Sequence, residues 1–334
     1  MDEKKLLKIV NLKKYFPAGR TLYGRAKSFV KAVDDVSFEV GEGETLGIVG
    51  ESGSGKTTLA RLIMRLIEPT AGKIYFQGVD ILSLNAREML KIRPMMQMIF
   101  QDPMASLNPR KKVRQTLKQV YKLHTDLSDE EIDAKIAELL ERVGMSPPEL
   151  FLERYPHELS GGQRQRICIA RAIALNPKVI IADEPVSALD VSIRGQIINL
   201  LLELRKQFPK IAYIIISHDI ALIRAMCSKT LVMYAGKAVE FGETNDVIHK
   251  PLHPYTAMLI SALPLPDPEL TRKRIRTPIT GETPSLINPP SGCRFHPRCP
   301  YVMEKCKQVH PPHVGAGERM VSCYLYGEST DTNT

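Results

Sequence analysis

The stretch that decides the fold of this chain is a glycine-rich loop, Gly50-Glu51-Ser52-Gly53-Ser54-Gly55-Lys56-Thr57. It matches the pattern G-x-x-x-x-G-K-[ST] at every fixed position. An apolar run, Thr45–Val49, comes before the loop, and a helix-like segment beginning at Thr58 follows it. The glycines let successive backbone N–H groups face a polyphosphate, and the helix N-terminus favours negative charge. We therefore expect a phosphate-binding loop in which Lys56 reaches the β- and γ-phosphates, Thr57 binds Mg²⁺ and Thr58 adds a nucleotide contact.

Length and composition are those of an ordinary globular protein with an excess of basic residues. The chain has 334 residues, of which 43% are hydrophobic and 25% charged, and its formal net charge is +9. This apolar content suffices for a sizeable core and excludes a disordered chain. The positive charge is spread along the sequence, which argues against a nucleic-acid tail and suits a phosphate ligand or an anionic membrane surface.

The sequence also indicates a compartment. It contains no apolar run of about 18 residues, so we expect no membrane-spanning helix. The polar start, Met1–Lys5, does not have the pattern of a signal peptide. Both observations predict a cytoplasmic protein, in which the six cysteines would stay reduced.

Apolar, strand-like runs alternate with amphipathic helices over most of the chain, which predicts an α/β fold with a mainly parallel sheet covered by helices. Two runs, Val179–Ala182 and Ile211–Ser217, have the β-branched character of strands buried on both faces. The first 40 residues alternate instead, and indicate an antiparallel sheet beside the main core. Residues 84–155 read as helical, with a capping box that begins at Ser128 and a stop at Gly144, so we expect an inserted helical subdomain.

The composition changes after Gly242. Prolines recur from Pro251 to Pro290 and periodic structure is scarce, which indicates a loop-rich segment. We therefore predict two domains: residues 1–250, with the helical subdomain inserted, and a C-terminal extension over residues 251–334.

Two acids, Asp183 and Glu184, follow the first of the two buried strands. An acid at the end of a strand near a phosphate loop suits Mg²⁺, often through water, and we assign that role to Asp183. Glu184 is then placed to polarise a water for attack on the γ-phosphate. The other interpretation is that both acids only solvate the end of the strand, and the phosphate loop makes it the weaker one.

A second anion site is predicted at Leu159-Ser160-Gly161-Gly162-Gln163. Ser160 suits the N-cap of a helix, and the two glycines leave the N–H groups of its first turn exposed. Because the phosphate loop already serves one nucleotide, this second site implies a nucleotide held by a partner chain.

In this order the motifs resemble those of ATP-binding-cassette (ABC) transporter ATPases. Within residues 5–250 they are the phosphate loop, Phe100-Gln101-Asp102, the Leu159–Gln163 signature, Asp183-Glu184, Ser187-Ala188-Leu189-Asp190 and His218. The resemblance implies a P-loop NTPase with a RecA-like parallel-sheet core, an N-terminal antiparallel β subdomain and Mg²⁺-dependent ATP hydrolysis.

The resemblance also implies roles for single residues. Gln101 would sense the γ-phosphate and Mg²⁺ and link the site to a membrane partner. His218 would hold the γ-phosphate and the attacking water, although a histidine at a strand end can also be a purely structural hydrogen-bonding group. The ATP held mainly by the opposite subunit would be bound by Ser160, Gly162 and Gln163, with Asp190 in the loop that crosses the interface.

An aromatic residue in the N-terminal sheet of this family stacks on adenine. Tyr15 matches best, but the stretch Pro17–Phe29 is longer than the family pattern. Phe16 and Phe29 therefore stay open as alternatives.

Four cysteines, Cys293, Cys299, Cys306 and Cys323, lie in the loop-rich extension. A segment that buries little apolar surface needs a covalent or metal staple. Their wide, irregular spacing favours an iron–sulfur cluster, because zinc sites usually show tight C-x₂₋₄-C pairs. A zinc site that uses nearby histidines (His296, His310 and His313) and a set of metal-free thiols are the alternatives. Cys168 and Cys227 lie in helical segments and are expected to be buried small hydrophobes.

The extension narrows the resemblance. Pro251–Thr256 and Gly292–Pro300 are similar to the C-terminal region of dipeptide and oligopeptide importer ATPases, some of which carry a [4Fe–4S] cluster there. The stretches Ser106–Val113 and Asp183–Asp190 resemble the F-type subunit of these importers more than the D-type. Related nickel importers share the same extension.

The resemblance therefore implies an ATPase subunit of a peptide importer, bound at the cytoplasmic face of the membrane. Its partners would be a D-type ATPase subunit or a second copy, two transmembrane permeases and, indirectly, an extracytoplasmic peptide-binding protein. A nickel or other small-solute importer is the first alternative. A soluble ABC ATPase that acts on nucleic acid or ribosomes would suit the basic charge, but the long coiled-coil insertions or tandem cassettes of that class are missing, so we expect no nucleic acid.

Overall fold

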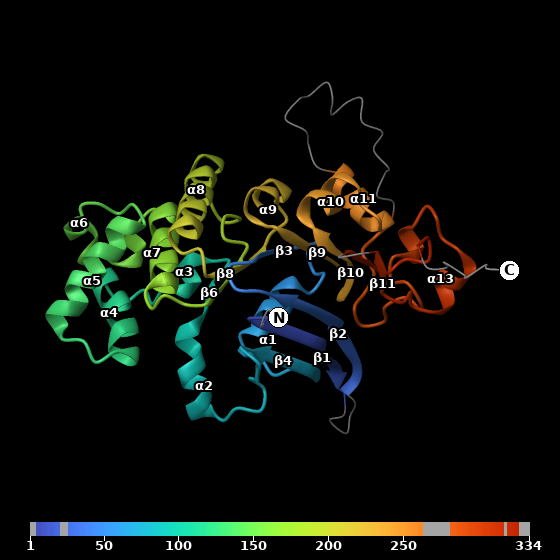
Figure 1. Cartoon of the computed structure of the whole chain (residues 1–334), viewed down its shortest axis with the longest axis horizontal. Helices are drawn as coiled ribbons and strands as arrows, with labels where there is room; N and C mark the ends of the chain where they lie inside the picture. The colour runs from blue at the N-terminus through green and yellow to red at the C-terminus, as the bar shows by residue number, and fades with distance from the viewer. Residues whose placement is uncertain (1–4, 21–25, 263–280, 317–318, 327–334) are drawn as a thin grey trace. The chain divides into compact units, whose positions relative to one another are not determined.

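The computed structural model describes residues 5–20, 26–262, 281–316 and 319–326. The chain forms two compact units. Unit 1 comprises Met1–Val40, Thr45–Leu82 and Ser217–Thr334, and unit 2 comprises Gly41–Glu44 and Ser83–Ile216. Figure 1 shows the whole chain, coloured from blue at the N-terminus to red at the C-terminus.

Unit 1 contains the expected N-terminal antiparallel sheet, with strand order β2-β1-β4-β5. Its strands are β1 (Leu7–Arg20), β2 (Ala26–Val40), β4 (Ala71–Phe76) and β5 (Val79–Asp80). Leu7, Ile9 and Leu12 are fully buried on β1. Register shifts between Ile9 and Leu12 keep these three side chains on the inner face, as a bulge does when it changes the period of two.

A second sheet of unit 1 carries the phosphate loop. Its strands run in the order β11-β12-β10-β9-β3. They are β3 (Thr45–Val49), β9 (Lys229–Tyr234), β10 (Lys237–Glu243), β11 (Val314–Ala316) and β12 (Arg319–Val321). Strand β3 is parallel to β9, and every one of its five residues is buried. The α-helices here are α1 (Lys56–Ile63), α9 (Ile220–Met226), α10 (Thr244–His249) and α11 (Pro254–Ser261).

The C-terminal extension is built onto this second sheet. Strand β12 pairs with β10 at Glu240↔Val321, and the short helices η3 (His296–Arg298) and α13 (Glu304–Gln308) lie between Cys293 and Cys323 in the chain. Tyr234, Tyr255 and Phe295 form an aromatic cluster with ring centroids 4.5–5.5 Å apart. The extension therefore packs into unit 1, although the predicted boundary near residue 250 stays a prediction. The prolines within 263–280 lie outside the described residues.

Unit 2 contains the expected parallel strands, in the order β8-β7-β6. They are β6 (Met96–Ile99), β7 (Val179–Asp183) and β8 (Ala212–Ile216), and β7 and β8 are buried at every residue. This confirms the interpretation of their β-branched runs as strands buried on both faces. The predicted helical segment, 84–155, also contains β6, so its purely helical part begins after Ile99.

The helices of unit 2 are coloured in Figure 1 from teal at α2 through green to yellow-green at α8. They are α2 (Ala86–Ile92), η1 (Arg93–Met95), α3 (Pro103–Ser106), α4 (Val113–His124), α5 (Asp129–Arg142), α6 (Glu149–Leu152), η2 (Pro156–Glu158), α7 (Gly161–Ile173) and α8 (Val191–Gln207). The capping box of Ser128 and Glu131 begins α5 as expected. Gly144, at φ +72°, follows its last residues, where a left-handed glycine ends a helix.

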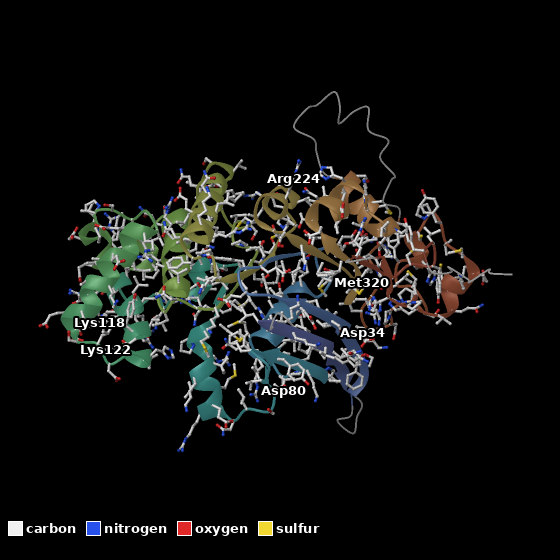
Figure 2. The ribbon with its side chains drawn as sticks, viewed as in Figure 1. Asp34, Asp80, Lys118, Lys122, Arg224 and Met320 are labelled. Atoms are coloured by element: carbon white, nitrogen blue, oxygen red, sulfur yellow. The ribbon has the colours of Figure 1, made fainter. Side chains whose placement is uncertain are left out.

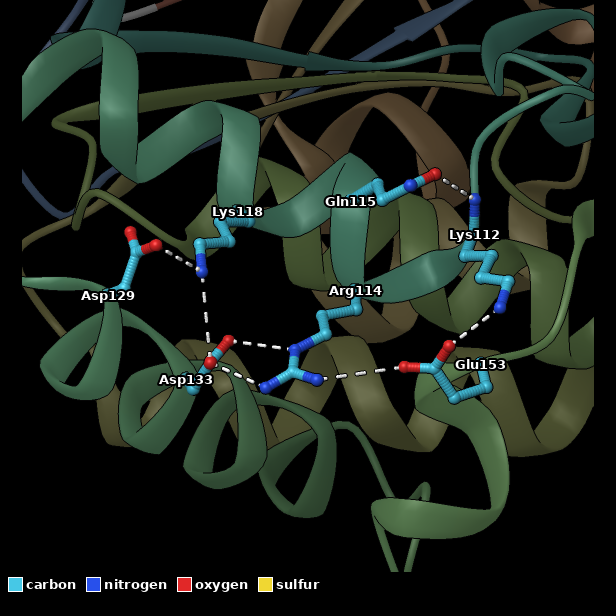
Figure 3. A network of polar contacts seen from close by, with 7 residues as sticks. All are labelled: Lys112, Arg114, Gln115, Lys118, Asp129, Asp133 and Glu153. Carbon is cyan, nitrogen blue, oxygen red and sulfur yellow. Dashed lines mark hydrogen bonds and ion pairs between the residues drawn. The ribbon is translucent and has the colours of Figure 1, made fainter.

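A polar network joins α4 to α5 and α6 (Figure 3). Arg114 donates to both carboxylate oxygens of Asp133, at 3.0 and 2.5 Å, and lies 3.7 Å from Glu153. Lys118 lies 3.1 Å from Asp129 and 3.8 Å from Asp133. The hydrogen bond from Arg114 lowers the pKa of Asp133. Because these side chains are partly exposed to solvent, each ion pair adds little to the stability of the fold.

Candidate functional site

The phosphate loop of unit 1 has a backbone conformation that favours glycine at three positions. Gly50, Gly53 and Gly55 have φ of +151°, +76° and +101°. A Cβ on Gly50 would lie 2.1 Å from the Met233 carbonyl oxygen, and one on Gly55 would lie 2.0 Å from that of Ala32. The loop backbone at Gly50 and Gly55 thus lies directly against neighbouring backbone, and the loop leads straight into the start of α1.

Lys56 lies inside this curve. Its Nζ donates to the carbonyl oxygens of Gly50, at 2.7 Å, and Glu51, at 2.8 Å, and only 7% of the residue is exposed. Ser54 is buried, Ser52 is exposed, and the adjacent helix residues Thr57 and Thr58 are half-buried. The ammonium group is therefore held where it can meet a polyphosphate, with a hydroxyl beside it that suits a hard cation such as Mg²⁺.

His218 also belongs to unit 1. The amide of Ser217 donates to the Ile48 carbonyl at 3.2 Å, so the neighbouring His218 lies beside the end of β3, close to the phosphate loop. Its side chain is exposed, and Asp219 caps α9 by accepting from the amides of Ala221 and Leu222. The histidine is thus carried at a helix start and is accessible to a ligand.

Tyr15 lies on β1 and is tied to the sheet by its hydroxyl. It donates to Asp34 on β2 at 2.5 Å, and Asp34 also pairs with Arg294 of the extension (Asp34 is labelled in Figure 2). Burial, followed by this hydrogen bond, raises the pKa of Tyr15 to about 12. Phe29 is 48% exposed and Phe16 is half-buried. All three residues are at least partly exposed, so the choice of Tyr15 for adenine stays a prediction.

Asp183 and Glu184 stand at the end of β7 in unit 2. Asp183 is 2% exposed, and Glu184 is half-buried. Glu184 has φ +49°, a left-handed conformation that is uncommon for a residue other than glycine. Its amide donates to the Ile216 carbonyl at 2.9 Å, and its own carbonyl accepts from the Ser187 hydroxyl at 3.0 Å. Local strain at a carboxylate held in this way is typical of a functional position.

Gln101 follows β6 in the same unit and is exposed. The next residue, Asp102, caps α3 by accepting from the amides of Met104 and Ala105. Gln101 is therefore an exposed residue in the short connection between strand β6 and the capped helix α3.

The predicted second anion site lies at the start of α7. Ser160 and Gln163 form a capping box, in which the Gln163 amide donates to Ser160 Oγ at 3.2 Å and the Ser160 amide donates to Gln163 Oε1 at 2.9 Å. A Cβ on Gly162 would lie 2.7 Å from Ile193 of α8, so this glycine also allows close helix packing. Asp190, the N-cap residue of α8, is exposed. The nucleotide contacts assigned to these residues stay predictions.

The four cysteines of the extension line one small cavity of about 10 Å³ in unit 1. Three of them are buried and Cys299 is half-buried. Burial, followed by the nearby cysteines, raises the pKa of Cys293 to about 12, so a metal must displace protons to bind. Among the described residues, however, no three His, Cys, Asp or Glu side chains are grouped so that they could hold a metal ion. The shared cavity agrees with the predicted iron–sulfur cluster, but the side chains of the described residues are not arranged to ligate a metal.

The remaining cysteines and histidines agree with a structural role. Cys168 and Cys227 are buried, as expected. The structure describes all six cysteines and joins none of them in a disulfide. His296 Nδ1 lies 3.0 Å from the Cys293 carbonyl, and His313 Nδ1 lies 2.6 Å from the Ser322 hydroxyl. Both ring nitrogens of His310 are buried without a hydrogen-bond partner among the described residues, so the zinc alternative stays open.

The structure also shows contacts that the sequence analysis missed. Arg298 of η3 forms a two-pronged ion pair with Glu51 of the phosphate loop, at 2.9 and 3.0 Å. The residues are separated by more than two hundred positions, and nothing in the local pattern around either one indicates the pairing. The sequence offers only a weak indication of this ion pair: an acidic residue, Glu51, at an x position of the loop pattern, and two arginines between Cys293 and Cys299.

No helix in the described parts of the chain has the length and apolar content needed to cross a membrane.

Comparison with known proteins gives two family matches. The family described as "ABC transporter" matches residues 33–187, and the family described as "Oligopeptide/dipeptide transporter, C-terminal region" matches residues 239–306. Together they cover the phosphate loop, the signature, the acids after β7 and three of the four clustered cysteines.

Similar proteins match along nearly the whole chain. The oligopeptide transport ATP-binding protein AppF of Bacillus subtilis (strain 168) is 48% identical over 97% of this chain and 98% of its own length. OppF of Salmonella typhimurium, also an oligopeptide transport ATP-binding protein, is 46% identical over 96% of each chain. The dipeptide transport ATP-binding protein DppF of Escherichia coli (strain K12) is 42% identical over 96% of this chain and 94% of its own.

Among solved structures, the ATP-binding cassette MJ0796, in a dimeric post-hydrolysis state bound to ADP and phosphate, is 30% identical. The match covers 71% of this chain and 98% of that one, with a TM-score of 0.63. The predicted ABC cassette fold is therefore confirmed.

Proposed function

Because this chain belongs to the ABC transporter ATPases of the oligopeptide and dipeptide family, we propose that it is the ATP-hydrolysing subunit that powers import of di- or oligopeptides. The observation that carries the proposal is the near full-length match to peptide transport ATP-binding proteins, extension included. The relatives named above are all peptide transport proteins, so nothing favours the nickel alternative. A transporter-specific extension likewise speaks against an ATPase that acts on nucleic acid or ribosomes.

The chain's own residues support the following chemistry. The loop N–H groups and Lys56 bind and orient the β- and γ-phosphates of ATP, and Thr57 and Asp183 supply the oxygen donors that Mg²⁺ prefers. Bound Mg²⁺ would neutralise charge that develops on the phosphate oxygens. Glu184 accepts a proton from the attacking water, while His218 and Gln101 orient that water and the γ-phosphate.

We further propose that two cassettes close around two ATP molecules. The α7 start, with Ser160, Gly162 and Gln163, would contact ATP bound by the other subunit, and Asp190 would lie at the interface. The dimeric state of the similar cassette supports this arrangement. The second subunit would be a D-type ATPase or another copy of this chain.

A groove of about 320 Å³ in unit 2 supports a docking site for the permeases. Ser106, Asn108 and Leu123 line it, and the groove therefore adjoins the segment that follows Gln101, the residue expected to link the nucleotide site to the membrane partner. Leu123 is 67% exposed, an apolar side chain that a partner would cover. The subunit would then bind peripherally at the cytoplasmic face, with the peptide-binding protein on the opposite side.

Uptake by the assembled transporter in proteoliposomes tests this function. We expect ATP-dependent accumulation of a labelled tripeptide and none of nickel ions. A Leu123→Glu variant should keep ATP binding but lose most uptake, because it places a charge in the groove, whereas Glu130→Gln on the exposed start of α5 should change neither. Nickel uptake without peptide uptake would contradict the proposed substrate class.

We also propose that the four extension cysteines hold an iron–sulfur cluster of the [4Fe–4S] type. Four thiols that line one cavity form the donor set that such clusters use. The cavity is small, so the lining must move apart to admit the cluster. The cluster would act as a structural staple of a segment with few strands and helices of its own.

Metal analysis of the full-length chain, purified without oxygen, tests whether the four cysteines hold an iron–sulfur cluster. We expect about four iron ions per chain and visible absorbance, because each thiolate ligates one iron. Cys306→Ser should lower iron content and thermal stability, whereas Cys168→Ser, a buried cysteine of α7, should leave iron content unchanged. Zinc in place of iron, or full stability of Cys306→Ser without any metal, would contradict the proposal.

A further inference from the structure

Three residues of the C-terminal extension form hydrogen bonds with one residue of the phosphate loop, Glu51. Arg298 Nη1 and Nη2 donate to the two carboxylate oxygens at 2.9 and 3.0 Å. Thr283 Oγ1 donates to the same carboxylate at 3.0 Å, and the Glu51 amide donates to the Tyr255 hydroxyl at 2.8 Å. Three residues of the extension thus hold both the side chain and the backbone of one loop residue.

Arg298 is itself rigidly held. Only 4% of its side chain is exposed, and its Nη1 also donates to the Tyr234 hydroxyl at 3.2 Å. The guanidinium lies 5.8 Å from the centre of the Tyr234 ring, which packs edge-on against Phe295. The hydrogen bonds to Glu51 raise the pKa of Arg298, so its charge is permanent. A planar, two-pronged contact from such a fixed group defines both the position and the orientation of the carboxylate.

Glu51 transmits this fixation to the phosphate-binding groups. Its carbonyl accepts from Lys56 Nζ at 2.8 Å and from the Ser54 amide at 3.2 Å. Lys56 is the motif lysine that reaches the phosphates, and the Ser54 amide belongs to the backbone of the loop that surrounds them. A shift of the Glu51 backbone would therefore displace both.

We propose that Arg298, together with Tyr255, is a positioning residue for ATP binding, which holds Glu51 and so sets the curve of the phosphate loop before the nucleotide arrives. The inference rests on the proposed function, since it assumes that this loop binds ATP. Glu51 is one of the four x positions of the pattern G-x-x-x-x-G-K-[ST], where any residue is allowed. The contact between Arg298 and Glu51 is therefore not a requirement of the motif itself and depends on the extension of this chain.

The expected consequence is an effect on binding, not only on stability. A loop residue released from its contacts must be ordered again when ATP binds, and the free energy for that ordering comes from the binding energy. Arg298→Gln should therefore raise the Kd for Mg²⁺ and AMP-PNP, a non-hydrolysable ATP analogue, about tenfold in the full-length chain. Arg298→Lys, which keeps the charge but not the two-pronged geometry, should recover part of the affinity. Titration calorimetry on each variant measures these values.

A matched variant separates positioning from stability. Arg319 of β12 pairs with the buried Glu240 at 2.7 Å in the same unit, and the contacts described above for Glu51 include neither residue. We expect Arg319→Gln to lower thermal stability as Arg298→Gln does but to leave the Kd unchanged. Glu51→Gln should weaken binding like Arg298→Gln, and the double variant should be no weaker than either single one, because both remove the same contact.

The outcomes distinguish failure of this inference from failure of the proposed function. If Arg298→Gln and Arg319→Gln both lower stability and neither changes the Kd, Arg298 is purely structural and the inference is wrong. Lys56→Ala serves as the reference for the function itself and should abolish binding. If Lys56→Ala binds as tightly as the wild type, it is the ATP-binding role of the loop that fails.

Discussion

Glu184→Gln is expected to reduce ATP turnover by about 10²–10⁴-fold while ATP binding stays intact, because an amide cannot accept the proton of the attacking water. The substitution preserves size and shape. The Glu184 N–H donates a hydrogen bond to the Ile216 carbonyl at 2.9 Å, and the Glu184 carbonyl accepts one from the Ser187 hydroxyl at 3.0 Å. Neither hydrogen bond involves the carboxylate. We therefore expect the left-handed conformation at this residue to persist in the variant.

Phosphate release measured at saturating Mg²⁺ and ATP tests this prediction, with ATP binding followed in parallel. Glu203→Gln, an exposed carboxylate on α8, is the matched control and should turn over ATP at the wild-type rate. Equal hydrolysis by wild type and Glu184→Gln would remove Glu184 from the role of general base and leave the rest of the nucleotide site unaffected.

The second large effect is expected for Gly55→Ala, which should abolish detectable ATP binding. The new Cβ would stand 2.0 Å from the Ala32 carbonyl oxygen, and the residue has φ +101°. Backbone must shift to relieve that contact, and Gly55 is the N-cap residue of α1, next to Lys56 and Thr57. We expect a loss of stability of about 2–4 kcal/mol in addition, from overpacking and backbone strain together.

Gly53→Ala provides a matched comparison within the same loop. Gly53 also has a positive φ, +76°, but a Cβ there would meet nothing within 4 Å. Only the conformational penalty of about 1–2 kcal/mol applies, so the loop should stay intact and ATP binding should weaken slightly. Nucleotide titrations and thermal unfolding of both variants give the comparison. Equal losses at Gly53 and Gly55 would show that close backbone packing does not shape this loop.

Local sequence patterns were enough for much of the architecture. The run Val179–Ala182 predicted a strand buried on both faces, and β7 is buried throughout. Ser128 and Ser160 each predicted a helix start, and both form capping boxes. These signals lie within a few residues of each other, and their physical causes, side-chain alternation and end-group hydrogen bonding, act over the same short range. The helical segment 84–155 was less well bounded, because strand β6 is a short apolar run among helices.

The sequence by itself determined that this chain is an ABC-type ATPase with a peptide-importer extension, since loop, signature and acids are each encoded in contiguous residues. Only the tertiary structure decided that Arg298 holds Glu51 and that Asp34 joins Tyr15 to Arg294. It also decided the left-handed backbone of Glu184. Each of these depends on segments far apart in the chain that folding brings within hydrogen-bonding or packing distance, and no local pattern encodes which distant partner a charged or strained residue will meet.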